Sequence, residues 1–477
     1  MRIGLISGDG LPVSGLLTVF RNVFELGKSL GVADDQVIAD LGYTWRPDKP
    51  GFFPSGPVGP YTPDWLVVDD ARPVTDAADW AGIGAELVLI RDTVARHDQL
   101  TPAEHRSLAR RIATAAAPYR QGFTDWLERH RIDWVFALNM TLSDAVPVTV
   151  ALHEAAAAYY ADKPGGVLFW DHDLFESCAI HDETTGQRMY PSRPNRYTPV
   201  PRPSAHTRWA VVSEPLAAEA YSYPTGLTPY IAPNVLPRVT AAPLEERHHS
   251  FAGQYHLDPG RPVLLAPVRV FAVKGVDVSL TFLEALKAEA LRRGRPVPYL
   301  LVFGSLAEDP PYARQVVAQA ERLGVADDVR FLDGVPLASF ASADGRHHLD
   351  ETDLLRLARA TSGGVVFTPS VADVETVGLG PALAAVAGLP VAVTDYEVFQ
   401  KIYGDEFTST RVDVSDEGFR AAASAFLDVL HGGPSAHAAA LARNQAVVRQ
   451  AFPEEPWIKL WRLLAEAAGH KPRGSRV

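Results

Sequence analysis

The chain alternates short apolar runs with longer amphipathic segments, and this alternation repeats along most of its length. The apolar runs are rich in Val, Ile and Leu, which is typical of strands buried on both faces of a sheet. Strands that alternate with helices predict parallel sheets covered by helices on both faces. We therefore expect an α/β fold of doubly wound, Rossmann-like sheets. The predicted strands are residues 2–6, 133–138, 166–170, 208–212, 262–267, 299–303, 329–332, 364–368 and 390–394.

The amphipathic segments predict helices, and one of them has a clear starting signal. Thr101-Pro102-Ala103-Glu104 is a capping box with proline at the first helical position, and it predicts a helix that runs to about Arg129. The segment Tyr43–Pro60 is rich in proline, glycine and aromatic residues, so we expect a loop insertion there. Further helices are predicted at residues 16–30, 153–160, 276–293, 312–323, 353–360, 381–387, 418–430, 436–451 and 457–467.

A break in the alternation at Pro233–Pro237 divides the chain. Polar, turn-rich residues follow through about His249, and the strand–helix pattern then restarts. Two blocks of this kind predict two doubly wound domains, which we place at residues 1–235 and 236–450. Residues 451–477 remain as a C-terminal helical segment.

Composition narrows the class of protein. Apolar residues make up 47% and charged residues 21% of 477 residues, as in packed globular proteins. No apolar stretch approaches ~20 residues, so no membrane span is expected. The net charge of −12 argues against non-specific binding to nucleic acid or to an anionic membrane. Cys178 is the single cysteine, which excludes an intrachain disulfide, and the N-terminus lacks a signal-peptide pattern, so we expect a cytoplasmic protein.

Ligands of open α/β sheets bind at the carboxyl ends of strands, so the residues after each strand are the candidates for a site. Arg269 and Lys274 follow the predicted strand 262–267. An arginine fork and a lysine ammonium at this place suit a diphosphate. The alternative interpretation of the two cations is a solvated surface pair.

A second candidate segment follows the predicted strand 364–368. Gly378 and Gly380 would let the backbone approach a ligand, and the N–H groups at the start of the next helix would bind a phosphate oxygen. Glu375 could accept hydrogen bonds from hydroxyl groups of a sugar. The alternative is an ordinary strand–loop–helix connection with a capping glutamate.

Two further candidates lie in the first half of the chain. Asp171-His172-Asp173 ends a strand and could chelate a divalent cation, with His172 or His181 adding a nitrogen ligand. The same residues could instead contact a transferred group or its acceptor, or form a simple turn. Ser14-Gly15 could face an acceptor or a phosphate, or could belong to a plain strand–helix turn.

Together these motifs resemble the GT-B glycosyltransferases, and above all the retaining glycosyltransferase family 4. Arg269 and Lys274 resemble the family's pair that holds the donor diphosphate. Pro369-Ser370 through Glu375 to Gly378-Leu379 resembles its "Pro-Ser … Glu-x-x-Gly-Leu" signature, in which the glutamate contacts the donor sugar. Phe303-Gly304 and Val329–Val335 resemble further parts of the family's donor-binding half. The first half matches more weakly, through the glycine loop Gly8–Gly15, His172, Ser213-Glu214 and Pro233-Asn234.

The resemblance implies two Rossmann-like domains that face each other across a cleft. The first would bind the acceptor and the second the donor, and the C-terminal helix would cross back onto the first domain. The implied activity is a retaining, hexosyltransferase-like, metal-independent transfer of a UDP- or GDP-linked sugar to a small soluble acceptor, such as a specialised metabolite, without a further cofactor. The implied catalytic residues are His172, Arg269, Lys274 and Glu375, and the implied donor-binding residues are Gly15, Gly304, Val335, Gly378, Leu379 and Gly380.

The sequence also departs from the family pattern. Leu383 stands where the family usually carries a second glutamate, which binds the donor ribose. Asp395-Tyr396-Glu397 replaces a familiar glycine pair after the strand that ends at Thr394. These departures leave two other functions open, a GT-B sugar phosphorylase or a catalytically inactive GT-B-like partner subunit. The oligomeric state is not predicted.

Overall fold

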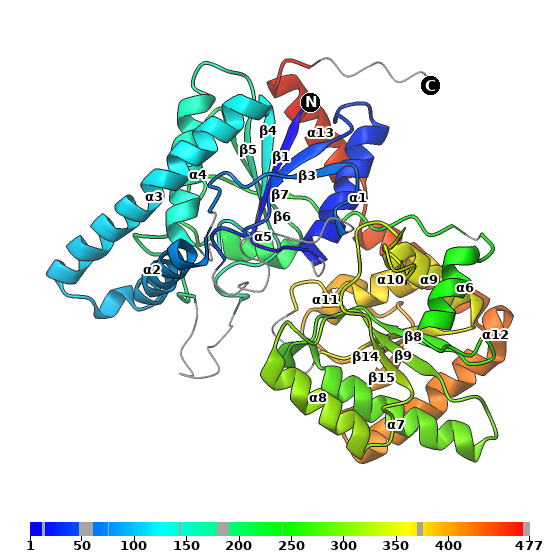
Figure 1. The fold of residues 1–477 in the computed structure, drawn as a ribbon. Helices are drawn as coiled ribbons and strands as arrows, with labels where there is room; N and C mark the ends of the chain where they lie inside the picture. The colour runs from blue at the N-terminus through cyan, green and yellow to red at the C-terminus, as the bar shows by residue number, and fades with distance from the viewer. Residues whose placement is uncertain are drawn as a thin grey trace. The chain divides into compact units, whose positions relative to one another are not determined.

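The computed structural model describes residues 1–11, 15–46, 61–74, 76–142, 145–178, 190–240, 242–369 and 375–470. Within these ranges the chain forms two parallel sheets, each with helices on both faces (Figure 1). The predicted α/β fold with doubly wound sheets is therefore confirmed. Ser14, His181 and Ser370 lie outside the described residues.

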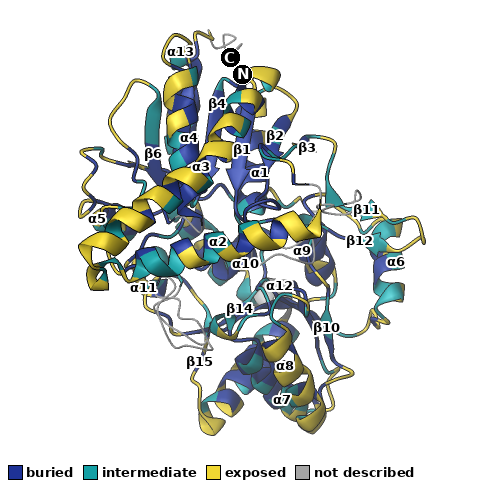
Figure 2. Cartoon of the chain, turned by 60° about the vertical axis from the view of Figure 1, so that its left-hand side comes forward, coloured by how far each residue is buried: buried dark blue, intermediate teal, exposed yellow. Residues whose placement is uncertain are grey.

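The chain divides into two compact units. Of the described residues, the first unit contains those of Met1–Gly10, 15–234 and 454–470, and the second contains Leu11 and those of Val235–Pro453. Each unit has its own sheet and its own buried core, which Figure 2 shows as dark strands beneath helices with exposed outer faces.

The sheet of the first unit has the strand order β3-β2-β1-β4-β5-β6-β7, and all of its strands are parallel. The order reverses direction between β1 and β4. Its strands are β1 (Ile3–Ser7), β2 (Val37–Asp40), β3 (Leu66–Val68), β4 (Trp134–Leu138), β5 (Gly166–Asp171), β6 (Thr207–Val211) and β7 (Tyr230–Ile231). Its helices are α1 (Gly15–Ser29), α2 (Ala77–Ala95), α3 (Pro102–His130), α4 (Val146–Tyr159), α5 (Glu214–Ala220) and α13 (Glu455–Ala467), with a 3₁₀ turn η2 at His97–Gln99.

The structure bears on two local predictions for this unit, the start of helix α3 and the loop insertion at Tyr43–Pro60. The capping box at Thr101 and Glu104 forms as predicted and starts α3, which continues past Pro118 to His130. Of the predicted insertion Tyr43–Pro60, residues 47–60 lie outside the described part, while Tyr43 and Trp45 are buried in the core.

Helix α13, near the end of the chain, is anchored in the first unit by tryptophan side chains. The indole N–H of Trp457 donates to the Pro233 carbonyl at 2.7 Å, and that of Trp461 donates to the Val23 carbonyl at 3.1 Å. Both indoles are fully buried. Trp461 lies directly over Gly27 of α1, where a Cβ would come within 2.6 Å of its ring.

This close approach predicts opposite effects for two glycine-to-alanine substitutions. Gly27→Ala should lower the free energy of unfolding by about 1–3 kcal/mol, because the new methyl group overpacks the Trp461 ring. Gly82→Ala in α2, where a Cβ meets no atom within 4 Å, should raise it by up to about 1 kcal/mol through helix propensity. Urea unfolding of the two variants measures both values, and a stabilising Gly27→Ala would contradict the packing described here.

The sheet of the second unit has the order β10-β9-β8-β13-β14-β15, again all parallel. In chain order this is 3-2-1-4-5-6, the order of dinucleotide-binding folds, and it reverses between β8 and β13. Its strands are β8 (Val263–Ala266), β9 (Tyr299–Val302), β10 (Val329–Phe331), β13 (Gly364–Phe367), β14 (Val391–Thr394) and β15 (Thr410–Val412), and a small antiparallel pair is formed by β11 (Phe340–Ala341) and β12 (His347–His348). Its helices are α6 (Glu246–Gln254), α7 (Val276–Arg292), α8 (Pro310–Arg322), α9 (Glu351–Ala360), α10 (Gly380–Ala387), α11 (Phe399–Tyr403) and α12 (Asp416–Ala451), with a 3₁₀ turn η3 at Ala272–Lys274.

One helix prediction in this unit is wrong. The sequence predicts separate helices at residues 418–430 and 436–451, but the structure has one 36-residue helix, α12. The glycines and the proline at residues 432–434 favour a break on local propensity. Packing of α12 along α7 and α10 outweighs that preference.

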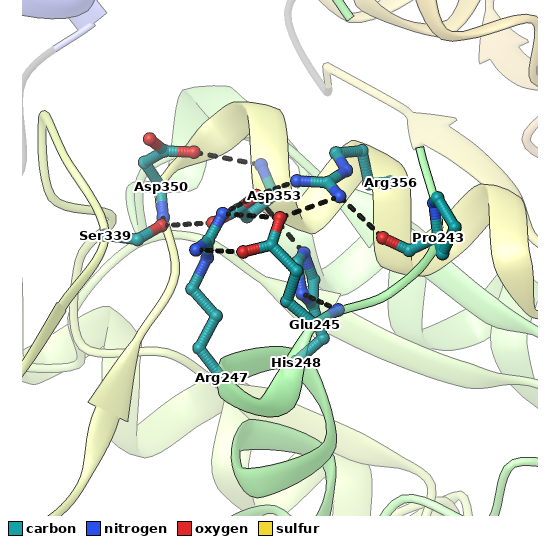
Figure 3. A network of polar contacts seen from close by, with 8 residues as sticks. All are labelled: Pro243, Glu245, Arg247, His248, Ser339, Asp350, Asp353 and Arg356. Atoms are coloured by element: carbon teal, nitrogen blue, oxygen red, sulfur yellow. Dashed lines mark hydrogen bonds and ion pairs between the residues drawn. The ribbon is translucent and has the colours of Figure 1, made fainter. Parts of the chain in front are cut away.

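A polar network with a buried centre joins the start of α6 to α9 (Figure 3). At its centre the carboxylate of Asp353 accepts hydrogen bonds from Arg247, His248, Ser339 and Arg356. Glu245 in turn binds both arginines of the network. The network thereby holds the segment that enters the unit in a fixed place beside its sheet. It consists of Pro243, Glu245, Arg247, His248, Ser339, Asp350, Asp353 and Arg356.

None of the helices in the described ranges combines the length and the apolar character that crossing a lipid bilayer requires.

Candidate functional site

The predicted donor residues of the second unit gather where its strand order reverses. Arg269 and Lys274 lie in the connection that follows β8, and Glu375 lies in the connection that follows β13. β8 and β13 are neighbours in the sheet, so both connections start at the same edge. In sheets of this order, ligands bind in the crevice at that reversal point.

Lys274 and Glu375 are 101 positions apart in the sequence and form an ion pair, Nζ to Oε1. Their side chains are 28% and 11% exposed, so the pair is shielded but open to a ligand. Lys274 ends the 3₁₀ turn η3, and Gly275 follows it with φ 63°, a left-handed conformation that suits glycine. The hydroxyl of Thr368, at the end of β13, donates to the Gly275 carbonyl at 3.2 Å and joins the two connections.

Arg269 is held by an acidic residue that the sequence analysis did not name. Its Nε donates to the Glu308 carboxylate, and its guanidinium lies 4.7 Å from the ring centre of Phe271. Glu308 also accepts from the backbone N–H of Ser305 at 3.0 Å. Because Glu308 follows β9, the rule applied to the other strand ends would have found it.

Gly304 and Val335 lie in neighbouring connections of the same sheet. The N–H of Gly304 donates to the Val268 carbonyl at 2.9 Å, and a Cβ on Gly304 would come within 2.7 Å of the Arg269 Cα. A side chain there would displace the loop that carries Arg269. Val335 is half-buried in the loop after β10.

Gly378 is clamped by two tyrosines. It has φ 69°, and its carbonyl accepts hydrogen bonds from the hydroxyls of Tyr396 at 3.3 Å and Tyr403 at 2.5 Å. A Cβ on Gly378 would overlap the Tyr396 hydroxyl. Desolvation raises the pKa of both tyrosines above the ordinary range, so both hydroxyls remain donors at neutral pH.

The start of α10 follows directly. Leu379 is its half-buried N-cap residue and supplies no side-chain hydrogen bond, and Pro381 lies in the first turn. Gly380 packs on Phe367, whose ring a Cβ would meet at 2.5 Å. Within the described residues, the first turn of α10 is therefore without a side-chain cap, and its N–H groups carry the partial positive charge that attracts an anion.

The tyrosine clamp makes Gly378 sensitive to substitution. Gly378→Ala should destabilise the protein by about 2–3 kcal/mol, because a left-handed backbone strain and a clash with Tyr396 add together. Gly324→Ala, with φ 64° but no atom within 4 Å of its Cβ, should show only the smaller backbone effect of about 1 kcal/mol. Adding Tyr396→Phe to Gly378→Ala should restore part of the loss in thermal unfolding. No recovery in the double variant would refute the clash.

In the first unit, Asn139 organises the strand end that carries His172. It follows β4 with φ 52°, and its side-chain oxygen accepts from the N–H groups of His172 at 2.7 Å and Asp173 at 3.3 Å. Its amide group donates to the Asp173 carboxylate at 3.0 Å. Asn139 was not among the predicted site residues, although it too stands directly after a strand. Gly15 is the exposed first residue of α1.

His172 is 7% exposed and binds through one ring nitrogen. Its Nε2 lies 3.1 Å from the side-chain oxygen of Asn234, and its ring centre lies 4.5 Å from that of Trp170. Burial lowers the pKa of His172 to about 4, so the imidazole is neutral at pH 7.

The neighbouring aspartates do not form a chelate with His172. Asp171 is buried and accepts from the Trp209 indole N–H at 2.7 Å and from the Thr141 N–H at 3.3 Å. Burial raises the pKa of Asp171 to about 7. Asp173 binds Asn139 instead, and no group of three or more His, Cys, Asp or Glu side chains in the described ranges is arranged to hold a metal ion.

The two departures from the family pattern are also visible. Leu383 lies inside α10 and is 4% exposed, so its side chain belongs to the core. Asp395 is exposed at the end of β14 and pairs with Arg411 at 3.1 Å.

No family model matches the sequence. A D-inositol 3-phosphate glycosyltransferase of Segniliparus rotundus is 33% identical over 140 residues, which cover 29% of this chain and 28% of that protein. The trehalose-6-phosphate synthase OtsA superimposes with a TM-score of 0.57 at 12% identity, covering 99% of this chain and 100% of OtsA. HepE of Anabaena, solved with UDP and glucose, gives a TM-score of 0.52 at 14% identity, covering 98% and 99%. The chain therefore has the GT-B glycosyltransferase fold.

Proposed function

We propose that the protein is a retaining glycosyltransferase that moves a sugar from a nucleoside diphosphate to a small acceptor. The observation that carries the proposal is the Lys274–Glu375 pair at the reversal point between β8 and β13. In this proposal, the Lys274 ammonium would bind the diphosphate and the neighbouring Glu375 carboxylate would bind the sugar hydroxyls. The partial match to a D-inositol 3-phosphate glycosyltransferase supports the same reaction class.

In this proposal the leaving diphosphate is stabilised by fixed positive charge. An ammonium has three N–H donors and the contact with Glu375 uses one, so Lys274 can bind a phosphate oxygen without leaving its partner. Arg269 and the first turn of α10 would share the remaining charge. Glu375 would orient the donor sugar, and His172 would line the side of the transferred sugar. Because side chains and amides meet the charge of the leaving group, the reaction would need no metal ion.

UDP is the proposed donor nucleotide and GDP the next choice. HepE, which shares the fold, was solved with UDP and glucose. A panel of UDP- and GDP-sugars, assayed for release of the nucleoside diphosphate, tests the proposal. We expect release from at least one donor and the same rate with and without a chelator. A strict need for a divalent cation would overturn the metal-independent mechanism. If no donor released a nucleoside diphosphate and neither UDP nor GDP bound, the proposed activity would be overturned.

The buried Leu383 favours a second candidate, a sugar phosphorylase. An apolar residue at this place supplies no ligand for a ribose, and a phosphorylase would bind inorganic phosphate where the diphosphate is proposed. Turnover that depends on inorganic phosphate, with no preference among nucleoside diphosphates, would select this candidate.

A further inference from the structure

His172 has one ring nitrogen with a partner and one without. Nε2 lies 3.1 Å from the side-chain oxygen of Asn234. Nδ1 is buried and contacts no polar partner within the described part of the chain. A carbonyl oxygen only accepts hydrogen bonds, so the proton of the neutral imidazole belongs on Nε2 and Nδ1 carries the lone pair.

Asn234 is itself held in place. It is 3% exposed and follows Pro233, whose carbonyl accepts from the Trp457 indole at 2.7 Å. Trp457 also packs edge-on against Trp170 at 4.6 Å, and Trp170 lies against the His172 ring. Proline, two indoles and the imidazole thus form one packed group, in which the Asn234 side chain has little room to turn away from Nε2.

We propose that Asn234 is a positioning residue that keeps the proton of His172 on Nε2 and so reserves Nδ1 as an acceptor for a hydroxyl group of a bound sugar or acceptor. An unpartnered acceptor inside the protein is costly unless a ligand satisfies it. A hydroxyl group is the fitting partner, because it can donate one hydrogen bond to the lone pair of Nδ1. The part of the proposal that concerns the ligand rests on the proposed function, whereas the part that concerns the tautomer does not.

The charges around His172 agree with a neutral ring. Asp9 favours protonation from a distance, but the Asp171 carboxylate is engaged by Thr141 and Trp209, and Asp173 by Asn139. In this surrounding no carboxylate contacts the imidazole directly among the described residues. The uncharged amide of Asn234 therefore fixes the tautomer without adding a charge that would stabilise the imidazolium.

Nitrogen-15 NMR of the imidazole groups tests the tautomer in the full-length protein without any substrate. The His172 signals are identified by their loss in His172→Gln. We expect a protonated Nε2 and an unprotonated Nδ1 at pH 7 in the wild type. A proton on Nδ1 would overturn the proposal, even if Asn234 variants could not be produced in folded form.

Asn234→Leu then removes the acceptor at nearly constant volume. We expect the two tautomers to mix in this variant and kcat/KM for the donor sugar to fall roughly 5- to 150-fold, with binding of UDP alone unchanged. Asn444→Leu is the matched control, because Asn444 lies on α12 of the other unit, is 2% exposed and binds the backbone of Thr408. It should lower stability but leave the His172 signals as in the wild type.

Asn234→Asp separates positioning from packing. The carboxylate still accepts from Nε2 but stabilises the imidazolium, whose Nδ1 has become a donor. Activity should therefore be lost at low pH and recover as the pH rises above the increased pKa of His172. A pH profile identical to that of the wild type, or wild-type kinetics in Asn234→Leu, would contradict the role of Nδ1 as an acceptor.

Discussion

Replacing Lys274 by alanine is expected to lower kcat/KM for a nucleotide-sugar donor by roughly 30- to 1000-fold. The loss of one preorganised charge at a leaving group corresponds to about 2–4 kcal/mol of transition-state stabilisation. Lys274 is well placed for such an effect, since its side chain is 28% exposed and is fixed by Glu375. Arg269→Ala should act in the same direction, because Arg269 lies on the same connection and is held by Glu308.

The removal of Lys274 also leaves Glu375 without its cation, so a single variant does not isolate the contact with the donor. Glu375→Gln combined with Lys274→Ala removes the unpaired carboxylate and completes a double-variant cycle. The cycle consists of the wild type, Lys274→Ala, Glu375→Gln and the double variant. Lys459→Ala is the matched control, because Lys459 is 72% exposed and its ion-pair partner is Glu455 on its own helix. Steady-state kinetics with the best donor of the panel are measured for the four proteins of the cycle and for the control. Wild-type values in both Lys274→Ala and Arg269→Ala would refute the diphosphate role.

The second large effect concerns stability and not catalysis. Asp353→Ala should lower the free energy of unfolding by about 3–5 kcal/mol, since it removes the buried carboxylate partner of the buried Arg356 and leaves only the more exposed Glu245. Burial by itself would raise the pKa of Asp353, but hydrogen bonds from Arg247 and Ser339 outweigh it and lower this pKa. The contribution of Asp353 is therefore present at neutral pH and is lost as the pH falls through the acid range.

A matched control for Asp353 is available in the same unit. Asp344 is 61% exposed and pairs with Arg346 at 3.4 Å, so Asp344→Ala should change stability by no more than about 0.5 kcal/mol. Chemical unfolding at pH 7 and pH 4 compares the two variants with the wild type. The difference between Asp353→Ala and the wild type should shrink at the lower pH. Equal losses in the two variants would show that the network of Figure 3 contributes no more than a surface pair.

The sequence predicts the parallel sheets because their central strands are almost entirely apolar and well separated in the sequence. Every position is buried in five of these strands, β1, β4, β5, β8 and β13. Short apolar runs of this kind indicate strands that are covered on both faces of a sheet. Four short strands at or next to the sheet edges were not predicted, whereas the edge strand β10 was. β2, β3, β7 and β15 have two to four residues, and sheet pairing defines them more than their own composition does.

The cations and the loops of the candidate site could be predicted from the sequence, but the contacts that hold them were not predicted. Rules for strand ends find Arg269, Lys274 and Glu375, whereas the pairing of Lys274 with Glu375 depends on β8 and β13 being neighbours. Glu308 follows β9 and was overlooked although the same rule covers it. The hydroxyls of Tyr396 and Tyr403 were missed because nothing in the local sequence indicates that these tyrosines bind the Gly378 carbonyl. The assigned roles of all these residues stay predictions until they are tested.

A crystal structure of the protein with UDP tests the central claim most directly. We expect the diphosphate at the reversal point between β8 and β13, with Arg269, Lys274 and the first N–H groups of α10 within hydrogen-bond distance of its oxygens. UDP bound away from these groups, or a site that remains empty at saturating UDP, would contradict the account.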